Sequence, residues 1–150
     1  MKKITLAILF LSIGTVLHAQ ILTPVHWSYG AKRINKTEAV IFIKANIEDG
    51  WHVYSQFMKD GGPVKTTITF SPSRDYTLTG GAMEPKPVTV YEKSFNMEVS
   101  YFENTVIFQQ KIKLKTAKTF VKGSINYMTC NNKQCLPPDD IEFNIPVPVK

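Results

Sequence analysis

With 150 residues, the chain is long enough for one domain with a sizeable core and too short for two domains of ordinary size. Its 18 lysines and arginines outnumber its 12 aspartates and glutamates, which gives a formal net charge of +6, but these residues are spread along the chain rather than gathered in a block. Such a spread indicates a mildly basic, solvated surface and is weak evidence for binding to nucleic acid or to a membrane.

The first residues are typical of a secretory signal, with a basic start, an apolar run from Ile4 to about Leu17 and a small residue, Ala19, at a cleavage point. The apolar run is shorter than the roughly 18 residues that a membrane-spanning helix needs. We therefore expect a signal peptide over 1–19, one domain over 20–150 and an exported, soluble protein. The alternative is an uncleaved N-terminal anchor, because Leu17 is large for its place two residues before the cut.

The rest of the chain consists of short runs rich in β-branched and aromatic residues, separated by turn residues such as Asp49-Gly50. No stretch of ten or more residues after the signal shows helical periodicity. The predicted strands span residues 38–47, 51–57, 64–70, 76–79, 87–91, 105–114, 119–128 and 141–149.

Apolar and polar side chains alternate clearly in the strand predicted at 105–114, where Val106, Phe108, Gln110, Ile112 and Leu114 share one face. About eight short strands without crossover helices indicate an all-β fold, an immunoglobulin-like antiparallel β-sandwich. The alternate prolines of the final IPVPV suit an edge strand, because proline donates no hydrogen bond to a neighbouring strand.

The only two cysteines of the sequence, Cys130 and Cys135, lie in the segment INYMTCNNKQCLPP. Export permits a disulfide, and a lone pair in an exported domain is usually structural. However, closing a loop of six residues stabilises a fold by only about 2 kcal/mol, against nearly 5 kcal/mol for a loop of about 100 residues. The pair also lies in a turn of Asn131, Asn132 and Lys133, where both sulfurs could meet a partner. A structural staple and a redox pair both stay open at this point.

The sequence holds no other set of reactive side chains. His26 and His52 each stand beside a tryptophan and suit packed strand positions better than the role of a catalytic base. Neither lies at ligand spacing from the cysteines, so we expect no metal. We also expect no cofactor, because no phosphate-binding, dinucleotide-binding or hydrolase motif occurs.

Three segments resemble the N-terminal periplasmic domain of the DsbD family of thiol:disulfide interchange proteins. YMTCNNKQCLPP, residues 127–138, is similar to the family's redox-active hairpin, in which a cysteine ends a strand and the second cysteine precedes one residue and two prolines. EDGWHVYSQ, residues 48–56, is similar to the family's acidic-Gly-aromatic-x-x-Tyr strand start. EKSFNMEVSYFENTVIF, residues 92–108, looks like the family's cap loop and the strand after it.

The resemblance implies an immunoglobulin-like sandwich that acts in the periplasm as an electron relay, a thiol:disulfide oxidoreductase. By the matching positions, Cys135 forms the mixed disulfide with a partner and Cys130 resolves it, while Phe95 shields the pair as a cap. His52 and Tyr54 match aromatic positions near the pair, although the first of them is a histidine where the family has tyrosine.

The implied partners are a thioredoxin-like or membrane electron donor and an oxidised periplasmic client, either a disulfide isomerase or a thioredoxin-like protein. The best-known members continue into a membrane domain and a thioredoxin-like domain, so we expect separate proteins to supply the electrons here. We expect a monomer. Four residues separate the cysteines, one fewer than in those members.

Two other hypotheses stay open. The chain could be a non-enzymatic exported β-sandwich that binds a partner through loops or an edge strand, with a disulfide that only pins a hairpin. It could also descend from the redox family and have lost its partners, in which case the pair would react without a client.

Overall fold

The structure, a computed structural model, describes residues 22–149. The predicted signal peptide over 1–19 and its cleavage point lie outside the described residues. No helix in the described chain is long and apolar enough to cross a membrane. Within residues 22–149 the regular elements are eleven strands: β1 (Val25–Arg33), β2 (Glu38–Ile47), β3 (Trp51–Tyr54), β4 (Thr67–Phe70), β5 (Tyr76–Met83), β6 (Val88–Glu92), β7 (Met97–Glu103), β8 (Thr105–Leu114), β9 (Thr119–Tyr127), β10 (Thr129–Asn131) and β11 (Asp139–Val147).

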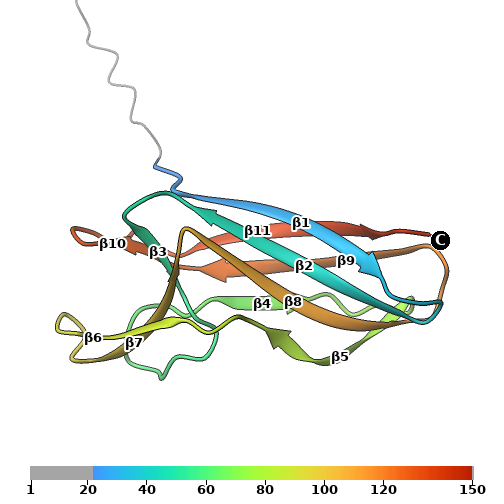
Figure 1. The fold of residues 1–150 in the computed structure, drawn as a ribbon, viewed down its shortest axis with the longest axis horizontal. Coiled ribbons are helices and arrows are strands. Elements are labelled where there is room, and N and C mark those ends of the chain that lie inside the picture. The colour runs from blue at the N-terminus through green and yellow to red at the C-terminus, as the bar shows by residue number, and fades with distance from the viewer. Residues whose placement is uncertain (1–21, 150) are drawn as a thin grey trace, which may run out of the picture.

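The strands form three antiparallel sheets (Figure 1). In the order of hydrogen-bonded neighbours, we call β1-β2-β8-β5 the long sheet, β11-β9-β4 the three-stranded sheet and β10-β3-β7-β6 the short sheet. Side chains of the long and three-stranded sheets share one buried core, and β1 also lies beside β11. This arrangement confirms the predicted immunoglobulin-like antiparallel β-sandwich. The short sheet lies at one end, at the left of Figure 1, where the hairpin after β10 and the turn between β6 and β7 both project.

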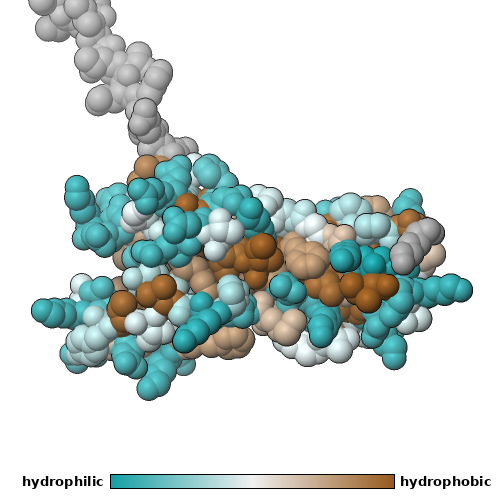
Figure 2. Space-filling view, viewed as in Figure 1, coloured by the Kyte–Doolittle hydropathy of each residue, from teal (hydrophilic) through white to brown (hydrophobic). Residues whose placement is uncertain are grey.

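Alternating burial along the strands places one face of the long sheet in the core. Every second residue of β8, from Val106 to Leu114, is buried, which confirms the predicted face. β2 shows the same pattern from Ala39 to Ile47. Each fully buried aliphatic or aromatic side chain of this kind stabilises the fold by about 1.5–3 kcal/mol. On the face drawn in Figure 2, apolar residues also lie over β2 and β8 among hydrophilic ones.

β5 runs further than the sequence predicts, to Met83 instead of residue 79. The glycine pair after Thr79 indicates a turn, but Gly80 adopts a φ of 70° within the strand, where the pairing register with β8 shifts. The side chain of Gln110, the polar member of the predicted apolar face, provides hydrogen bonds to the main chain at this bulge. Its side-chain Nε2 donates to the main-chain oxygens of Thr79 at 3.3 Å and Gly80 at 3.2 Å.

Three strands are absent from the prediction. β1 alternates apolar with small or polar residues around Gly30, which weakens its signal. β7 carries Glu98 and Glu103 among its apolar residues, which weakens its pattern, and β10 has only three residues. The strands predicted at 51–57 and 64–70 shorten to β3 and β4 because the chain leaves the sheet between them. β11 is the outer strand of its sheet, as its prolines predict.

A single residue, Asn104, joins β7 to β8 and turns the chain from the short sheet into the long sheet. Its φ of 59° lies in the left-handed region, which asparagine tolerates better than most residues. Its main-chain oxygen accepts a hydrogen bond from the N–H of Ile47 at 2.7 Å, where β2 ends and the chain turns toward β3. The two crossings between the sheets are therefore bonded to each other, which fixes the short sheet at its end of the sandwich.

Candidate functional site

Cys130 and Cys135 are joined by a disulfide, with an S–S distance of 1.99 Å and a Cα–Cα distance of 4.0 Å. Cys130 is the middle residue of β10, and Cys135 pairs with it across the hairpin as an isolated antiparallel bridge. Asn131 holds the turn between them. Its side-chain Oδ1 accepts hydrogen bonds from the main-chain N–H of Lys133 at 2.8 Å and of Gln134 at 2.9 Å. Asparagine favours such turns because its side chain bonds to the backbone just ahead of it.

The two cysteines differ in exposure. Cys130 is only 2% exposed, whereas Cys135 is an exposed residue. After Cys135, Leu136 turns back to pack on the main core, and its N–H donates to the main-chain oxygen of Thr129 at 2.9 Å. The hairpin therefore presents its second cysteine to solvent and keeps the first one covered.

The face of the short sheet that carries Cys130 has a definite composition. Cys130 lies opposite His52 on β3, and His52 lies opposite Glu103 on β7, so these three side chains share one face. In the next row along β3, Tyr54 lies opposite Tyr101 on the same face. A second buried cluster covers this face and contains Cys130; its other buried members are Tyr54, Met58 and Val99, and the half-buried side chains packed on it are Val90, Phe95, Met97, Tyr101 and Met128.

Phe95 lies in the turn of residues 93–96 between β6 and β7 and packs on the cluster that contains Cys130. The turn is ordered by its own hydrogen bonds. The carboxylate of Glu92 accepts from the N–H of Ser94 at 3.1 Å, and the N–H of Phe95 donates to the main-chain oxygen of Glu92 at 3.3 Å. The structure thus places Phe95 on the same cluster as the first cysteine, although the two residues are 35 positions apart in the sequence.

His52 and Tyr54 contact each other beside Cys130. The Nε2 atom of His52 lies 3.1 Å from the hydroxyl of Tyr54, and the ring centroids of His52 and Tyr101 are 4.5 Å apart. Burial lowers the pKa of His52, and the negative charges of Glu103 and Glu92 oppose this shift. Burial also raises the pKa of Tyr54 to about 12, with Glu92 acting in the same direction. At neutral pH, both side chains are therefore uncharged.

The surroundings of the disulfide suit a macromolecular partner better than an enclosed small molecule. A hollow of about 410 Å³ lies beside the hairpin, between Leu136, Pro137 and Pro138 on one side and Thr23 on the other. A larger hollow of about 590 Å³ surrounds Gly123 on the three-stranded sheet and is lined by no cysteine. Because Cys135 lies on an open surface, a partner surface can approach its sulfur directly.

Metal chemistry finds no support in the geometry of the described residues. Between residues 22 and 149, no three or more histidine, cysteine or acidic side chains converge as a metal site requires. His26 lies on β1, where its Nε2 lies 3.5 Å from the Oε1 atom of Glu48. The expected lack of a metal or cofactor stays a prediction.

Sequence reasoning did not identify several residues of this face. Met58, Val99, Tyr101 and Glu103 share it with Cys130, His52 and Tyr54. A signal was present for three of them, because Val99, Tyr101 and Glu103 alternate along the sequence as one face of a strand should. Nothing in the sequence indicates that Met58, which follows β3 by four residues, returns to cover the cluster.

Comparison with known sequences decides the family. The sequence profile of the family described as "Thiol:disulfide interchange protein DsbD, N-terminal" matches residues 19–146. The chain belongs to this family. The predicted resemblance is thereby confirmed over residues 19–146 of the chain. No curated protein matches the sequence.

Solved structures of DsbD-type N-terminal domains share the fold. The N-terminal periplasmic domain of ScsB from Proteus mirabilis has a TM-score of 0.60 at 17% identity, over 82% of this chain and 46% of that chain. The reduced DsbD N-terminal domain from Neisseria meningitidis has a TM-score of 0.54 at 17% identity, over 79% and 83% of the two chains. A complex between the DsbD and PilB N-terminal domains from the same organism gives 0.56 at 16% identity, over 83% and 87%. The chain therefore spans about half the length of the ScsB chain, and these similarities concern the fold alone.

Proposed function

We propose that this chain is a periplasmic thiol-disulfide exchange protein that passes reducing equivalents through Cys130 and Cys135. The observation that carries the proposal is the unequal exposure of the two cysteines, which form a disulfide in a short surface hairpin. An exposed sulfur can be attacked by a partner, and a covered sulfur next to it can release that partner. Membership of the DsbD N-terminal family supports this chemistry.

The exchange proceeds in two balanced steps. In the reduced protein, the Cys135 thiolate attacks one sulfur of a partner disulfide and forms a mixed disulfide, while the other partner sulfur leaves as a thiolate and takes up a proton. The Cys130 thiolate then attacks the Cys135 sulfur and expels the second partner sulfur, which is protonated in turn. The partner gains two electrons and two protons, and the protein regains the disulfide described above. A donor dithiol reduces this disulfide again by the same steps in reverse.

The neighbouring side chains have distinct roles in the proposal. Phe95 caps the Cys130 side of the pair, because a reduced resolving thiol left open in an oxidising compartment would be lost to other oxidants. The uncharged His52 and Tyr54 line the covered side of the pair. They place no full positive charge beside Cys130.

The partners and the location follow from the same family membership. The donor is a thioredoxin-like or membrane protein, and the client is an oxidised periplasmic disulfide isomerase or thioredoxin-like protein. One neighbour structure describes a DsbD N-terminal domain in complex with another protein domain, and another describes a periplasmic domain, which supports both points. The segment 1–19 is the export signal, residues 20–150 form the working domain, and the domain acts as a monomer.

A redox titration tests the proposal. The protein is equilibrated across glutathione and dithiothreitol buffers, and the free thiols are alkylated and counted by mass. A midpoint between roughly −180 and −270 mV, where known exchange proteins operate, is expected. A midpoint well below about −300 mV would identify a structural staple and favour a non-enzymatic binding module. The Cys130→Ala/Cys135→Ala variant is the control and should register no thiol at any potential.

A further inference from the structure

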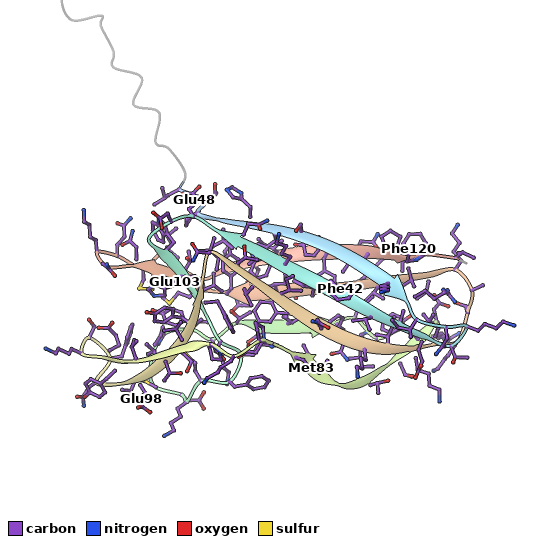
Figure 3. All side chains as sticks on the ribbon, in the orientation of Figure 1. Phe42, Glu48, Met83, Glu98, Glu103 and Phe120 are labelled. Atoms are coloured by element: carbon purple, nitrogen blue, oxygen red, sulfur yellow. A yellow bond between two sulfur atoms is a disulfide. The ribbon has the colours of Figure 1, made fainter. Side chains whose placement is uncertain are left out.

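Charged residues that are spread along the sequence gather at the two ends of the folded molecule. The disulfide end is built from segments 48–52, 92–104 and 129–140, which are joined where β3 pairs with both β7 and β10. These segments carry seven carboxylates and two lysines, and the loop at 55–66, whose Met58 belongs to the Cys130 cluster, adds Asp60, Lys59 and Lys65. In Figure 3, the labelled Glu48, Glu98 and Glu103 lie in the same half of the molecule as the disulfide.

The opposite end has the reverse composition. It is built from segments 32–38, 71–75 and 113–118, which hydrogen bonds join: the N–H of Leu114 donates to the oxygen of Thr37 at 2.7 Å, and that of Lys115 to the oxygen of Asp75 at 2.8 Å. We call these three segments the basic end. Two carboxylates, Glu38 and Asp75, face seven cations there: Lys32, Arg33, Lys36, Arg74, Lys113, Lys115 and Lys118.

The cations of the basic end are not neutralised by neighbouring carboxylates of the described chain. Within residues 22–149 the close contacts of basic with acidic side chains are those of His26 with Glu48 and of Lys65 with Asp60, and both lie outside the basic end. The five lysines of the basic end are exposed. Arg33 instead holds the loops together, because its guanidinium donates to the main-chain oxygens of Ala117 at 2.6 Å and Pro148 at 2.7 Å. The lysines therefore lie on loops that the hydrogen bonds of Arg33 hold in place, and their side chains are exposed to solvent.

A hollow and two exposed apolar side chains complete the basic end. The hollow has a volume of about 430 Å³, and Arg33, Lys36 and Lys115 line it together with apolar side chains that include Val149. Val149 is 63% exposed, and Ile34, next to Arg33 in the chain, is 49% exposed. Exposed aliphatic side chains among unpaired lysines suit the interfacial region of an anionic bilayer, where headgroups neutralise the lysines and apolar tips enter the boundary below them.

We propose that the basic end docks on an anionic lipid bilayer and that the disulfide end then faces away from it. The bilayer is favoured over an acidic protein because lipid headgroups move to meet lysines on separate loops, whereas a protein would need carboxylates fixed at matching positions. The seven carboxylates at the far end are repelled by the same surface, so the charge distribution favours a single orientation. Cys135 would be left accessible from the aqueous side. This inference does not depend on the redox activity.

Vesicle sedimentation tests the docking. The protein is used without the apolar residues 1–19, which would themselves enter lipid; all the described strands lie between Val25 and Val147. Binding is measured to vesicles of equal parts phosphatidylglycerol and phosphatidylcholine and to vesicles of phosphatidylcholine alone. At an ionic strength of about 0.01 M, where the Debye length is roughly 30 Å, only the anionic vesicles should bind the protein. At about 1 M, where it is roughly 3 Å, binding should be lost.

A matched pair of triple variants locates the binding surface. Each lysine near an anionic bilayer contributes about fivefold to partitioning, the equivalent of ~1 kcal/mol, so removing three of them should lower the partition coefficient about a hundredfold. The docking variant is Lys36→Gln/Lys115→Gln/Lys118→Gln. The control variant, Lys59→Gln/Lys65→Gln/Lys86→Gln, has the same net charge but changes exposed lysines outside the basic end, and should retain most of the binding.

Each outcome decides the proposal. No binding of the unchanged protein to anionic vesicles, equal losses in the two triple variants, or equal binding to phosphatidylcholine alone would each overturn it. So would competition by inorganic phosphate at low ionic strength beyond its effect as a salt, which would identify a free anion as the ligand. The orientation has its own readout: the rate at which a small uncharged thiol reduces the disulfide should be the same with and without vesicles. A large fall in that rate would place the disulfide end against the bilayer.

Discussion

The small size of the disulfide loop predicts a modest contribution to stability. Cys130 and Cys135 are separated by five positions in the sequence, so the bond closes a loop of six residues. In the chain-entropy model such a loop costs the unfolded chain about 7 cal/mol/K, which corresponds to about 2 kcal/mol at 25 °C. A domain of this size responds with a fall in Tm of roughly 5–10 °C. Reduction should therefore weaken the fold without unfolding it, as the proposed exchange requires.

Urea unfolding, followed by tryptophan fluorescence with and without dithiothreitol, measures this contribution. Trp27 is half-buried and Trp51 is 8% exposed, and both pack in or against the main core, so their emission reports global unfolding. The Cys130→Ala/Cys135→Ala variant is the control, because its unfolding midpoint should not respond to the reductant. A loss of about 5 kcal/mol, as for a loop of about 100 residues, or unfolding on reduction would refute the reasoning and indicate a staple.

Three further predictions concern the site. In Cys130→Ser, the remaining Cys135 should form a mixed disulfide with a partner that persists on a non-reducing gel, because no resolving thiol is left, whereas Cys135→Ser should form none. Phe95→Ala should speed alkylation of the reduced cysteines severalfold while the circular dichroism spectrum stays unchanged, because the half-buried ring packs on the cluster that contains Cys130. Burial lowers the pKa of His52 in the folded protein, so below about pH 6.5 the unfolded chain takes up a proton more readily and the fold loses stability. In urea titrations at falling pH, His52→Gln should therefore lose less stability than the unchanged protein.

Each of these predictions has a result that would contradict it. Equal trapping through either cysteine would show that the difference in exposure does not select the attacking sulfur. Phe120→Ala is the matched control for the cap, because Phe120 is 43% exposed on β9, at the other end of the molecule from the disulfide (Figure 3); an equal effect there would remove the cap role. An identical pH response of His52→Gln and the unchanged protein would show that the imidazole is not held neutral by burial.

The sequence predicts the fold class because the signal that defines it is local. In 105–114 and 38–47, one residue in two is buried and all of these except Gln110 are apolar, and such alternation can be recognised without knowing the neighbouring strand. Val25–Arg33 lacks so clear a pattern, since it carries a glycine and presents small or polar residues to solvent. Its place beside β2 is decided by the core that it helps to close, which is a property of the whole fold.

The candidate site is only partly predictable, because some of its features are local in the sequence and others depend on the whole fold. The cysteine spacing and the prolines after Cys135 lie in one short segment and can be recognised there. The register that puts Cys130 opposite His52, and His52 opposite Glu103, depends on the pairing of three strands from distant parts of the chain. The segregation of charge is likewise invisible in a sequence where lysines and carboxylates are interspersed, because it arises when loops from three regions meet at each end.

The turn held by Asn131 bears on how long a partner stays attached. Its hydrogen bonds to the N–H groups of Lys133 and Gln134 do not involve the sulfurs, so they can persist when the disulfide opens. In the proposed exchange, the Cys130 thiol then stays next to the mixed disulfide at Cys135 as a tethered nucleophile, and well-oriented groups of this kind reach effective molarities of about 10⁵–10⁸ M. No free thiol in solution competes with such a concentration. In the proposed exchange, the turn would therefore shorten the lifetime of the mixed disulfide by keeping the resolving thiol close to it.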